Sequence, residues 1–72
     1  MSEMGQPRVF VNGDGRAVDK GTTVGDLITA LGAADHGVAA ALNGRVVARD
    51  AWTTTAIADG DRLEVLTAAP GG

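Results

Sequence analysis

A chain of 72 residues forms one small domain and leaves no room for a second hydrophobic core. Nine acidic and six scattered basic residues give a net charge of −3, which argues against a nucleic-acid-binding surface. The absence of cysteine excludes disulfides and cysteine-based metal sites, and no apolar run approaches the roughly 20 residues that span a bilayer. We therefore expect a cytoplasmic protein that binds neither nucleic acid nor membrane.

The first part of the chain predicts a leader followed by a β-hairpin. Residues 1–7 are expected to form a flexible leader, too polar and too short for a signal peptide. Residues 8–12 have the apolar alternation of a strand. The Asn-Gly-Asp-Gly stretch at residues 12–15 predicts a turn, because these residue types tolerate positive φ. Residues 16–19 are then predicted to return as the second strand.

A helix is predicted over residues 23–31. Thr23 is a good N-cap, and Asp26 can reach back to it in a form of the capping box. Gly32 is suited to end the helix, whereas Gly25 in the first turn weakens it by up to about 1 kcal/mol relative to Ala. Gly25 therefore indicates either close packing at this point or a marginal helix. The apolar stripe at helical period consists of Val24, Leu27, Ile28 and Leu31.

A second hairpin and a crossover are predicted next. The small apolar residues 37–42 suit a buried strand, and Asn43-Gly44 is the strongest hairpin signal in the chain. Residues 45–48 are predicted to return from it. Residues 49–58 have no sheet period and are expected to cross the domain as irregular or short helical structure.

The last strand, residues 62–66, decides the predicted topology. Because it follows a crossover, it can lie parallel to the first strand at the centre of the sheet. We therefore predict an α+β fold of the ubiquitin-like β-grasp type, a mixed sheet of about five strands with one helix packed on one face. The domain is expected to span residues 8–67, with residues 68–72 as a flexible functional tail. Its predicted core comprises Val9, Val11, Leu27, Leu31, Leu42, Leu63 and Val65.

Five segments along the chain occur in an order and spacing typical of one family. They are Val11-Asn12-Gly13, residues 42–47, residues 49–52, residues 59–65 and Gly71-Gly72. No single segment is specific, but five in order are hard to obtain by chance. With this pattern the chain resembles, over residues 8–72, the ThiS family, the sulfur carrier proteins of thiamine biosynthesis. The short length favours ThiS over the related small subunit of molybdopterin synthase, MoaD.

The resemblance implies a sulfur carrier that is not an enzyme and has no catalytic residue of its own. A ThiF-type, E1-like adenylyltransferase would adenylate the carboxylate of Gly72 with ATP. A persulfide donor of the cysteine desulfurase or rhodanese type would then convert it to a thiocarboxylate. A ThiG-type thiazole synthase would receive the sulfur. The chain itself is expected to bind no cofactor, since ATP is used by the partner enzyme.

The residues of the tail are themselves suited to this chemistry. Gly71 and Gly72 lack Cβ atoms and can enter a narrow channel that places the carboxylate in line with the α-phosphate of ATP. Pro70 fixes its own φ near about −65° and biases Ala69 toward extended conformations, which partly stiffens the tail.

The residues before the two glycines leave alternatives open. Tails in the ThiS family more commonly carry Gln at this point, whereas this chain has Ala69-Pro70. A sulfur carrier for another pathway, such as MoaD-like molybdopterin, cysteine or natural-product biosynthesis, therefore stays open. A ubiquitin-like modifier of protein lysines and an interaction module with an inert tail are the further alternatives.

Four other residues attract attention but favour structural roles. His36 is the only histidine, has no nucleophile within reach, and is expected at the surface. Asp59 and Asp61 flank a glycine, which predicts an ordinary turn rather than a metal site. Trp52 is expected to pin the crossover onto the core.

The helix can cover only one face of the predicted sheet. If Val9 and Val11 face the helix, then Phe10 and Leu66 face away from it on adjacent central strands. Two large apolar side chains side by side on an open face predict a docking patch for the partner enzyme. The alternative is that the crossover or the leader covers them.

Overall fold

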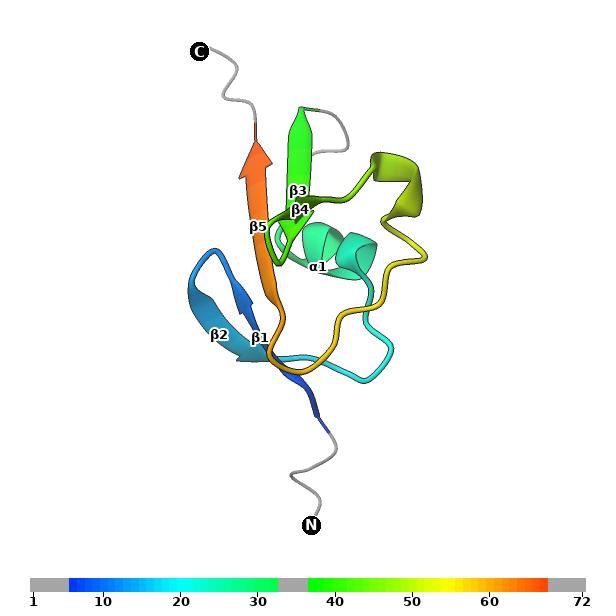
Figure 1. The fold of residues 1–72 in the computed structure, drawn as a ribbon. Coiled ribbons are helices and arrows are strands. Elements are labelled where there is room, and N and C mark those ends of the chain that lie inside the picture. Colours follow the sequence, from blue (N-terminus) through cyan, green and yellow to red (C-terminus); the bar gives the residue numbers. More distant parts are fainter. Residues whose placement is uncertain (1–5, 33–36, 68–72) are drawn as a thin grey trace.

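The computed structural model describes residues 6–32 and 37–67 and contains one α-helix, one short 3-10 helix and a five-stranded sheet within them. Figure 1 shows the helix against one face of the sheet. The elements in chain order are β1 (Arg8–Val11), β2 (Asp14–Ala17), α1 (Val24–Ala30), β3 (Val38–Leu42), β4 (Arg45–Val46), the 3-10 helix η2 (Arg49–Ala51) and β5 (Arg62–Thr67).

The sheet has the strand order β2-β1-β5-β3-β4, so the last strand lies at its centre. The strands β1 and β5 are parallel, with Phe10 opposite Arg62 and Val11 opposite Leu63. The other neighbours are antiparallel. This mixed sheet with one covering helix confirms the predicted β-grasp fold.

The first hairpin is tighter than the sequence predicted. Asn12 and Gly13 have φ values of 50° and 89°, and Val11 pairs with Asp14 across the turn. Positive φ at both central residues defines a two-residue turn whose twist matches that of the strands. The turn therefore ends at Gly13, and the prediction of a turn over residues 12–15 with a strand over 16–19 was wrong.

The second hairpin repeats this geometry. Asn43 and Gly44 have φ values of 53° and 84°, and Leu42 pairs with Arg45. β4 then ends after two residues, earlier than the predicted 45–48, although the backbone N–H of Val47 still donates to the carbonyl of Ala40 at 2.9 Å.

The helix begins and ends close to its predicted bounds. The Thr23 hydroxyl accepts from the N–H of Asp26 at 3.1 Å, and the Asp26 carboxylate accepts from the N–H of Thr23 at 3.0 Å, which completes the capping box. Gly32 has a φ of 75° and ends the helix, as expected. At Gly25 the crossover backbone comes close, since its N–H donates to the Trp52 carbonyl at 3.0 Å. A Cβ atom at this position would lie 3.4 Å from the Trp52 carbonyl oxygen, which is ordinary van der Waals contact, so the packing is close but does not require a glycine.

The core lies between the helix and the facing side of β1, β5 and β3. Trp52 is buried within it and its Nε1–H donates to the Val47 carbonyl at 2.9 Å, which confirms that this residue pins the crossover. Leu42 is only partly buried against the core. The buried residues are Val9, Val11, Val18, Val24, Leu27, Ile28, Ala40, Trp52, Ile57, Leu63 and Val65.

Leu31 does not belong to this core, so the prediction was wrong at this position. Its side chain is 41% exposed. The helix has ended by Leu31, which is the C-cap, and the packed stripe stops one turn earlier at Leu27 and Ile28.

Candidate functional site: the central strand and the outward sheet face

The central strand carries the chain from the core toward its C-terminus. β5 ends at Thr67, and the predicted site residues Pro70, Gly71 and Gly72 lie outside the described residues. His36 also lies outside them. The described part of the site is therefore the strand from which the tail continues and the sheet face around it.

The two halves of β5 have different neighbours. On the β3 side, pairing runs along the strand from Leu42 opposite Leu63 to Val38 opposite Thr67. On the β1 side, the paired positions end with Val11 opposite Leu63, because the chain then turns at Asn12. The C-terminal half of β5 is thus paired with a strand on one side only.

The asparagine side chains of both hairpins hold β5 from its two flanks. Asn12 accepts from the N–H of Val65 at 2.8 Å through Oδ1 and donates to the Val65 carbonyl at 3.3 Å through Nδ2. Asn43 accepts from the N–H of Arg62 at 2.9 Å. Sequence reasoning assigned both asparagines to turns alone, and it missed these contacts with a strand distant in sequence.

The acidic pair before β5 is used within the fold. Asp59 accepts from the N–H of Arg8 at 2.8 Å, and Asp61 accepts from the N–H of Ala58 at 2.8 Å. Asp61 also accepts from Nδ2 of Asn43 at 3.0 Å. Both carboxylates therefore stabilise the turn that begins β5, as predicted. In the parts of the chain that the structure describes, no group of three or more acidic, His or Cys residues could hold a metal ion.

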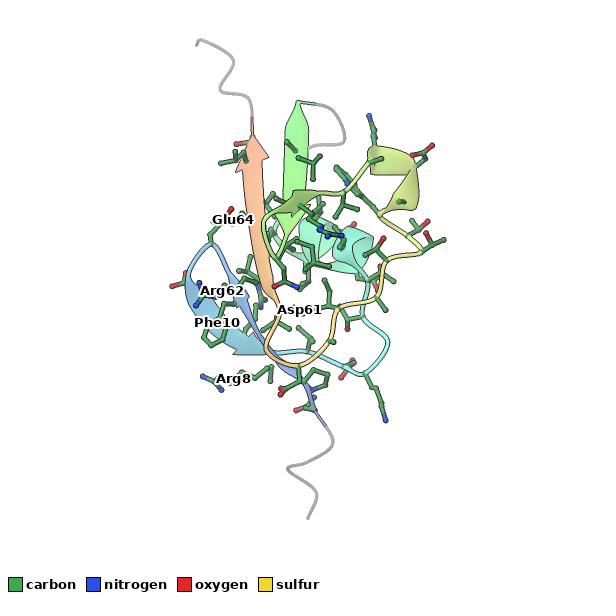
Figure 2. The ribbon with its side chains drawn as sticks, viewed as in Figure 1. Arg8, Phe10, Asp61, Arg62 and Glu64 are labelled. Atoms are coloured by element: carbon green, nitrogen blue, oxygen red, sulfur yellow. The ribbon has the colours of Figure 1, made fainter. Side chains whose placement is uncertain are left out.

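The outward face of the sheet, opposite the helix, carries exposed apolar side chains. Cross-strand neighbours point to the same face, so Phe10 shares it with Gly15 and Arg62, and Leu66 shares it with Ala39. Figure 2 labels Phe10, Arg62 and Glu64 on this face. Phe10 is 38% exposed and Leu66 is 69% exposed.

Phe10 and Leu66 do not lie side by side, which corrects the predicted arrangement. Phe10 is opposite Arg62 in the parallel register, and Leu66 follows four residues later on β5. The Phe10 ring instead leans over Gly15 of β2, where a Cβ atom would lie 3.3 Å from its Cε1. The register, which the sequence does not specify, therefore separates the two side chains along the strand direction.

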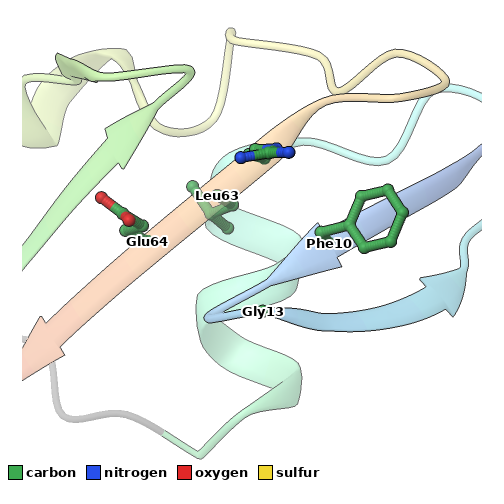
Figure 3. Close-up of a pocket in the computed structure, with 5 residues that line it drawn as sticks. Phe10, Gly13, Leu63 and Glu64 are labelled. Carbon is green, nitrogen blue, oxygen red and sulfur yellow. The ribbon is translucent and has the colours of Figure 1, made fainter.

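A shallow hollow lies beside Phe10, and Figure 3 shows it with helix α1 behind the sheet. It encloses about 270 Å³ and is lined by Phe10, Gly13, Arg62, Leu63 and Glu64. A second hollow lies around Leu66, lined by Gly37, Val38, Ala39, Leu66 and Thr67. The outward face therefore has two separate contact regions rather than one patch.

Sequence reasoning also missed Val46, a third exposed apolar residue of the outward face. Val46 is 81% exposed and lies opposite Ala41, which in turn lies opposite Glu64. In the sequence, only the alternation of residues 45–48 indicated that Val46 could be exposed. The register of the short strand β4 was needed to place its side chain on the outward face of the sheet.

Comparison with known proteins identifies the family. The chain matches the family model described as ThiS family over residues 5–72. It is similar to the crystal structure of the thiamine biosynthesis protein (ThiS) from Geobacter metallireducens, with 37% identity, a TM-score of 0.73, and coverage of 90% of this chain and 99% of that chain. It is also similar to the NMR solution structure of a thiamine biosynthesis protein from the same organism, with 37% identity, a TM-score of 0.75, and coverage of 90% and 87%.

Two further findings accompany these matches. None of the curated proteins matches this chain. Within residues 6–32 and 37–67, no helix has the length and apolar character needed to cross a membrane.

The family match extends over nearly the whole chain and agrees with the shared fold. This chain belongs to the ThiS family.

Proposed function

We propose that this chain is a sulfur carrier whose C-terminal Gly72 carboxylate is activated and converted to a thiocarboxylate. The observation that carries the proposal is the extent of the family match, which includes both terminal glycines. The fold agrees with it, because the strand that leads into the tail lies at the centre of the sheet. A thiocarboxylate on glycine also accounts for sulfur carriage by a chain without cysteine.

The proposed chemistry begins with adenylation by a ThiF-type, E1-like enzyme. The Gly72 carboxylate attacks the α-phosphate of ATP and releases pyrophosphate, which gives an acyl adenylate. A persulfide of the donor protein attacks the acyl carbon, and AMP leaves with the electron pair of the broken bond. A second thiol then reduces the resulting acyl disulfide, so that a disulfide and the Gly72 thiocarboxylate are formed. The chain supplies the reacting group, whereas ATP is bound and used by the partner.

The outward face of the sheet is proposed as the docking surface for the adenylating enzyme. Phe10, Val46 and Leu66 expose apolar area there, and Arg62 and Glu64 lie between them on β5. Apolar anchors surrounded by charged groups are typical of a protein interface. A partner that fits would place an apolar side chain at the hollow around Leu66 and a side chain with both apolar and polar groups at the hollow beside Phe10, whose lining includes Arg62 and Glu64.

Thiazole formation in thiamine biosynthesis is the proposed destination of the sulfur, with a ThiG-type thiazole synthase as acceptor. Support comes from the two similar structures, both of thiamine biosynthesis proteins from Geobacter metallireducens.

The proposal is tested by intact-mass measurement of the purified chain after incubation with a ThiF-type enzyme, ATP and a persulfide donor. The expected product has one oxygen replaced by sulfur, and it should depend on ATP. Subsequent incubation with a ThiG-type enzyme and its other substrates should return the carrier to its original mass. A ladder of heavy lysine conjugates in a cell extract, without a thiocarboxylate form, would instead indicate a protein modifier.

A further inference from the structure

A side chain extends the pairing between β1 and β5 beyond the point where β1 ends. The backbone N–H of Phe10 donates to the Asp61 carbonyl and that of Asn12 donates to the Leu63 carbonyl, both at 2.9 Å. The next peptide group on this side of β5 belongs to Val65, but the chain has turned away at Asn12 with a φ of 50°. The Asn12 side chain lies beside Val65, at the position that a further residue of β1 would have taken.

The Asn12 amide offers the same two groups as the missing backbone. Its Oδ1 accepts from the N–H of Val65 at 2.8 Å, and its Nδ2 donates to the Val65 carbonyl at 3.3 Å. A primary amide presents an acceptor oxygen and an N–H donor side by side, so one side chain can bond both backbone groups of the same residue. The parallel ladder therefore continues for one more residue of β5, although the contact joins positions 53 residues apart.

Asn43 holds the opposite end of β5 in a comparable way. It occupies the first position of the second hairpin with a φ of 53°. Its Oδ1 accepts from the N–H of Arg62 at 2.9 Å, and its Nδ2 donates to the Asp61 carboxylate at 3.0 Å. The two asparagines thus share residue type, turn geometry and number of side-chain hydrogen bonds. They differ in the half of the strand that they hold.

We propose that Asn12 is a positioning residue for the reacting terminus, an inference that rests on the proposed function. Val65 lies in the half of β5 that has a strand neighbour on one side only, and Thr67 is the last residue before the tail. Pairing with Val38 holds Thr67 on the β3 side. The two hydrogen bonds of Asn12 add a hold on the β1 side two residues earlier, and in this proposal the two together set the direction in which Thr67 leaves the sheet. Attack by a carboxylate in line with a phosphate is sensitive to displacements of about 1 Å, so that direction affects the rate of the chemical step.

Glycine substitution separates this role from a role in the hairpin. Gly adopts positive φ without strain, so Asn12→Gly keeps the two-residue turn and removes both contacts with Val65. Asn43→Gly is the matched control, because it removes the comparable contacts at the start of β5. Neither substitution alters Phe10, Val46 or Leu66 on the proposed docking face.

Amide hydrogen exchange tests the structural half of the proposal without any partner. In Asn12→Gly the Val65 amide should exchange about tenfold faster than in the parent, because two hydrogen bonds that opposed local opening are lost. The Arg62 amide should keep its parental protection. Asn43→Gly should show the reverse pattern. Parental protection of Val65 in Asn12→Gly would overturn the proposal.

Steady-state sulfur transfer tests the functional half, with the ThiF-type enzyme, ATP and a persulfide donor at varied carrier concentration. Asn12→Gly should lower kcat about fivefold or more and leave KM within about twofold of the parent, since docking is unchanged and only the terminus is misplaced. Asn43→Gly should keep both parameters near parental values. Equal losses in the two variants, or a parental kcat in Asn12→Gly, would overturn the positioning role. If the parent itself takes up no sulfur, the proposed function fails, and the exchange of Val65 still decides whether Asn12 holds the strand.

Discussion

The two faces of the same sheet differ in what their side chains do. On the helix face, Val9 and Leu63 are fully buried, whereas on the outward face Val46 and Leu66 are mostly exposed. Buried and exposed residues alternate along β1 and β5, so these two strands contribute to the core and to the open surface at once (Figures 2 and 3). The buried side chains on the helix-facing side therefore contribute most of the free energy of unfolding. Side chains on the outward face can vary to suit a binding partner with little effect on that free energy.

The largest expected effect is the loss of a helix-face contact. Leu27 is 3% exposed and lies in the core cluster beneath the helix. Leu27→Ala should lower the free energy of unfolding by about 2–5 kcal/mol, through lost burial and the cavity that remains. Urea or thermal denaturation followed by circular dichroism measures this change. A loss below about 1 kcal/mol would contradict the assignment of stability to this face.

The next effect concerns binding through the outward face. Leu66→Ser should weaken binding of the adenylating enzyme by about tenfold or more, since exposed apolar residues at the centre of an interface often carry much of its affinity. The free energy of unfolding should change by about 0.5 kcal/mol or less, as for most surface substitutions. Calorimetric titration and a denaturation curve measure the two quantities on the same sample. A loss of stability as large as the loss of binding free energy would show that Leu66 is structural.

The smallest effect is expected at Leu31, which serves as a control for the docking face. Its side chain is about as exposed as that of Phe10, but it lies at the C-cap of the helix. Leu31→Ser should leave binding of the adenylating enzyme unchanged and alter the free energy of unfolding by about 0.5 kcal/mol or less. Weakened binding in this variant would mean that the partner contacts the helix end as well as the sheet.

Much of the fold could be predicted from the sequence because its signals are local. The capping box at Thr23 and Asp26, the Asn43-Gly44 turn and the alternation in β5 each depend on residues within a few positions. The exposure of Leu31 could not be predicted in this way, because periodicity does not show where a helix stops packing on its sheet. The tight turn at Asn12-Gly13 was obscured by an overlapping turn signal in the next two residues.

The arrangement of the candidate site depends more strongly than the fold on the register between strands that are distant in sequence. That Phe10 and Leu66 both face outward follows from alternation, but their separation follows from the pairing of Phe10 with Arg62. The contact between Asn12 and Val65 joins two distant segments, and nothing beside Asn12 in the sequence indicates it. The role of Gly72 was inferred from the tail and the family pattern, and it stays a prediction.

The most direct test of the central claim compares the parent with a chain extended by one residue after Gly72. The extension moves the terminal carboxylate by about 3.5 Å and leaves the core and both sheet faces unaltered. Both proteins should therefore unfold at the same temperature. After incubation with the ThiF-type enzyme, ATP and a persulfide donor, intact mass should show one oxygen replaced by sulfur in the parent and no change in the extended chain. Efficient sulfur uptake by the extended chain would contradict the claim that the Gly72 carboxylate is the reacting group.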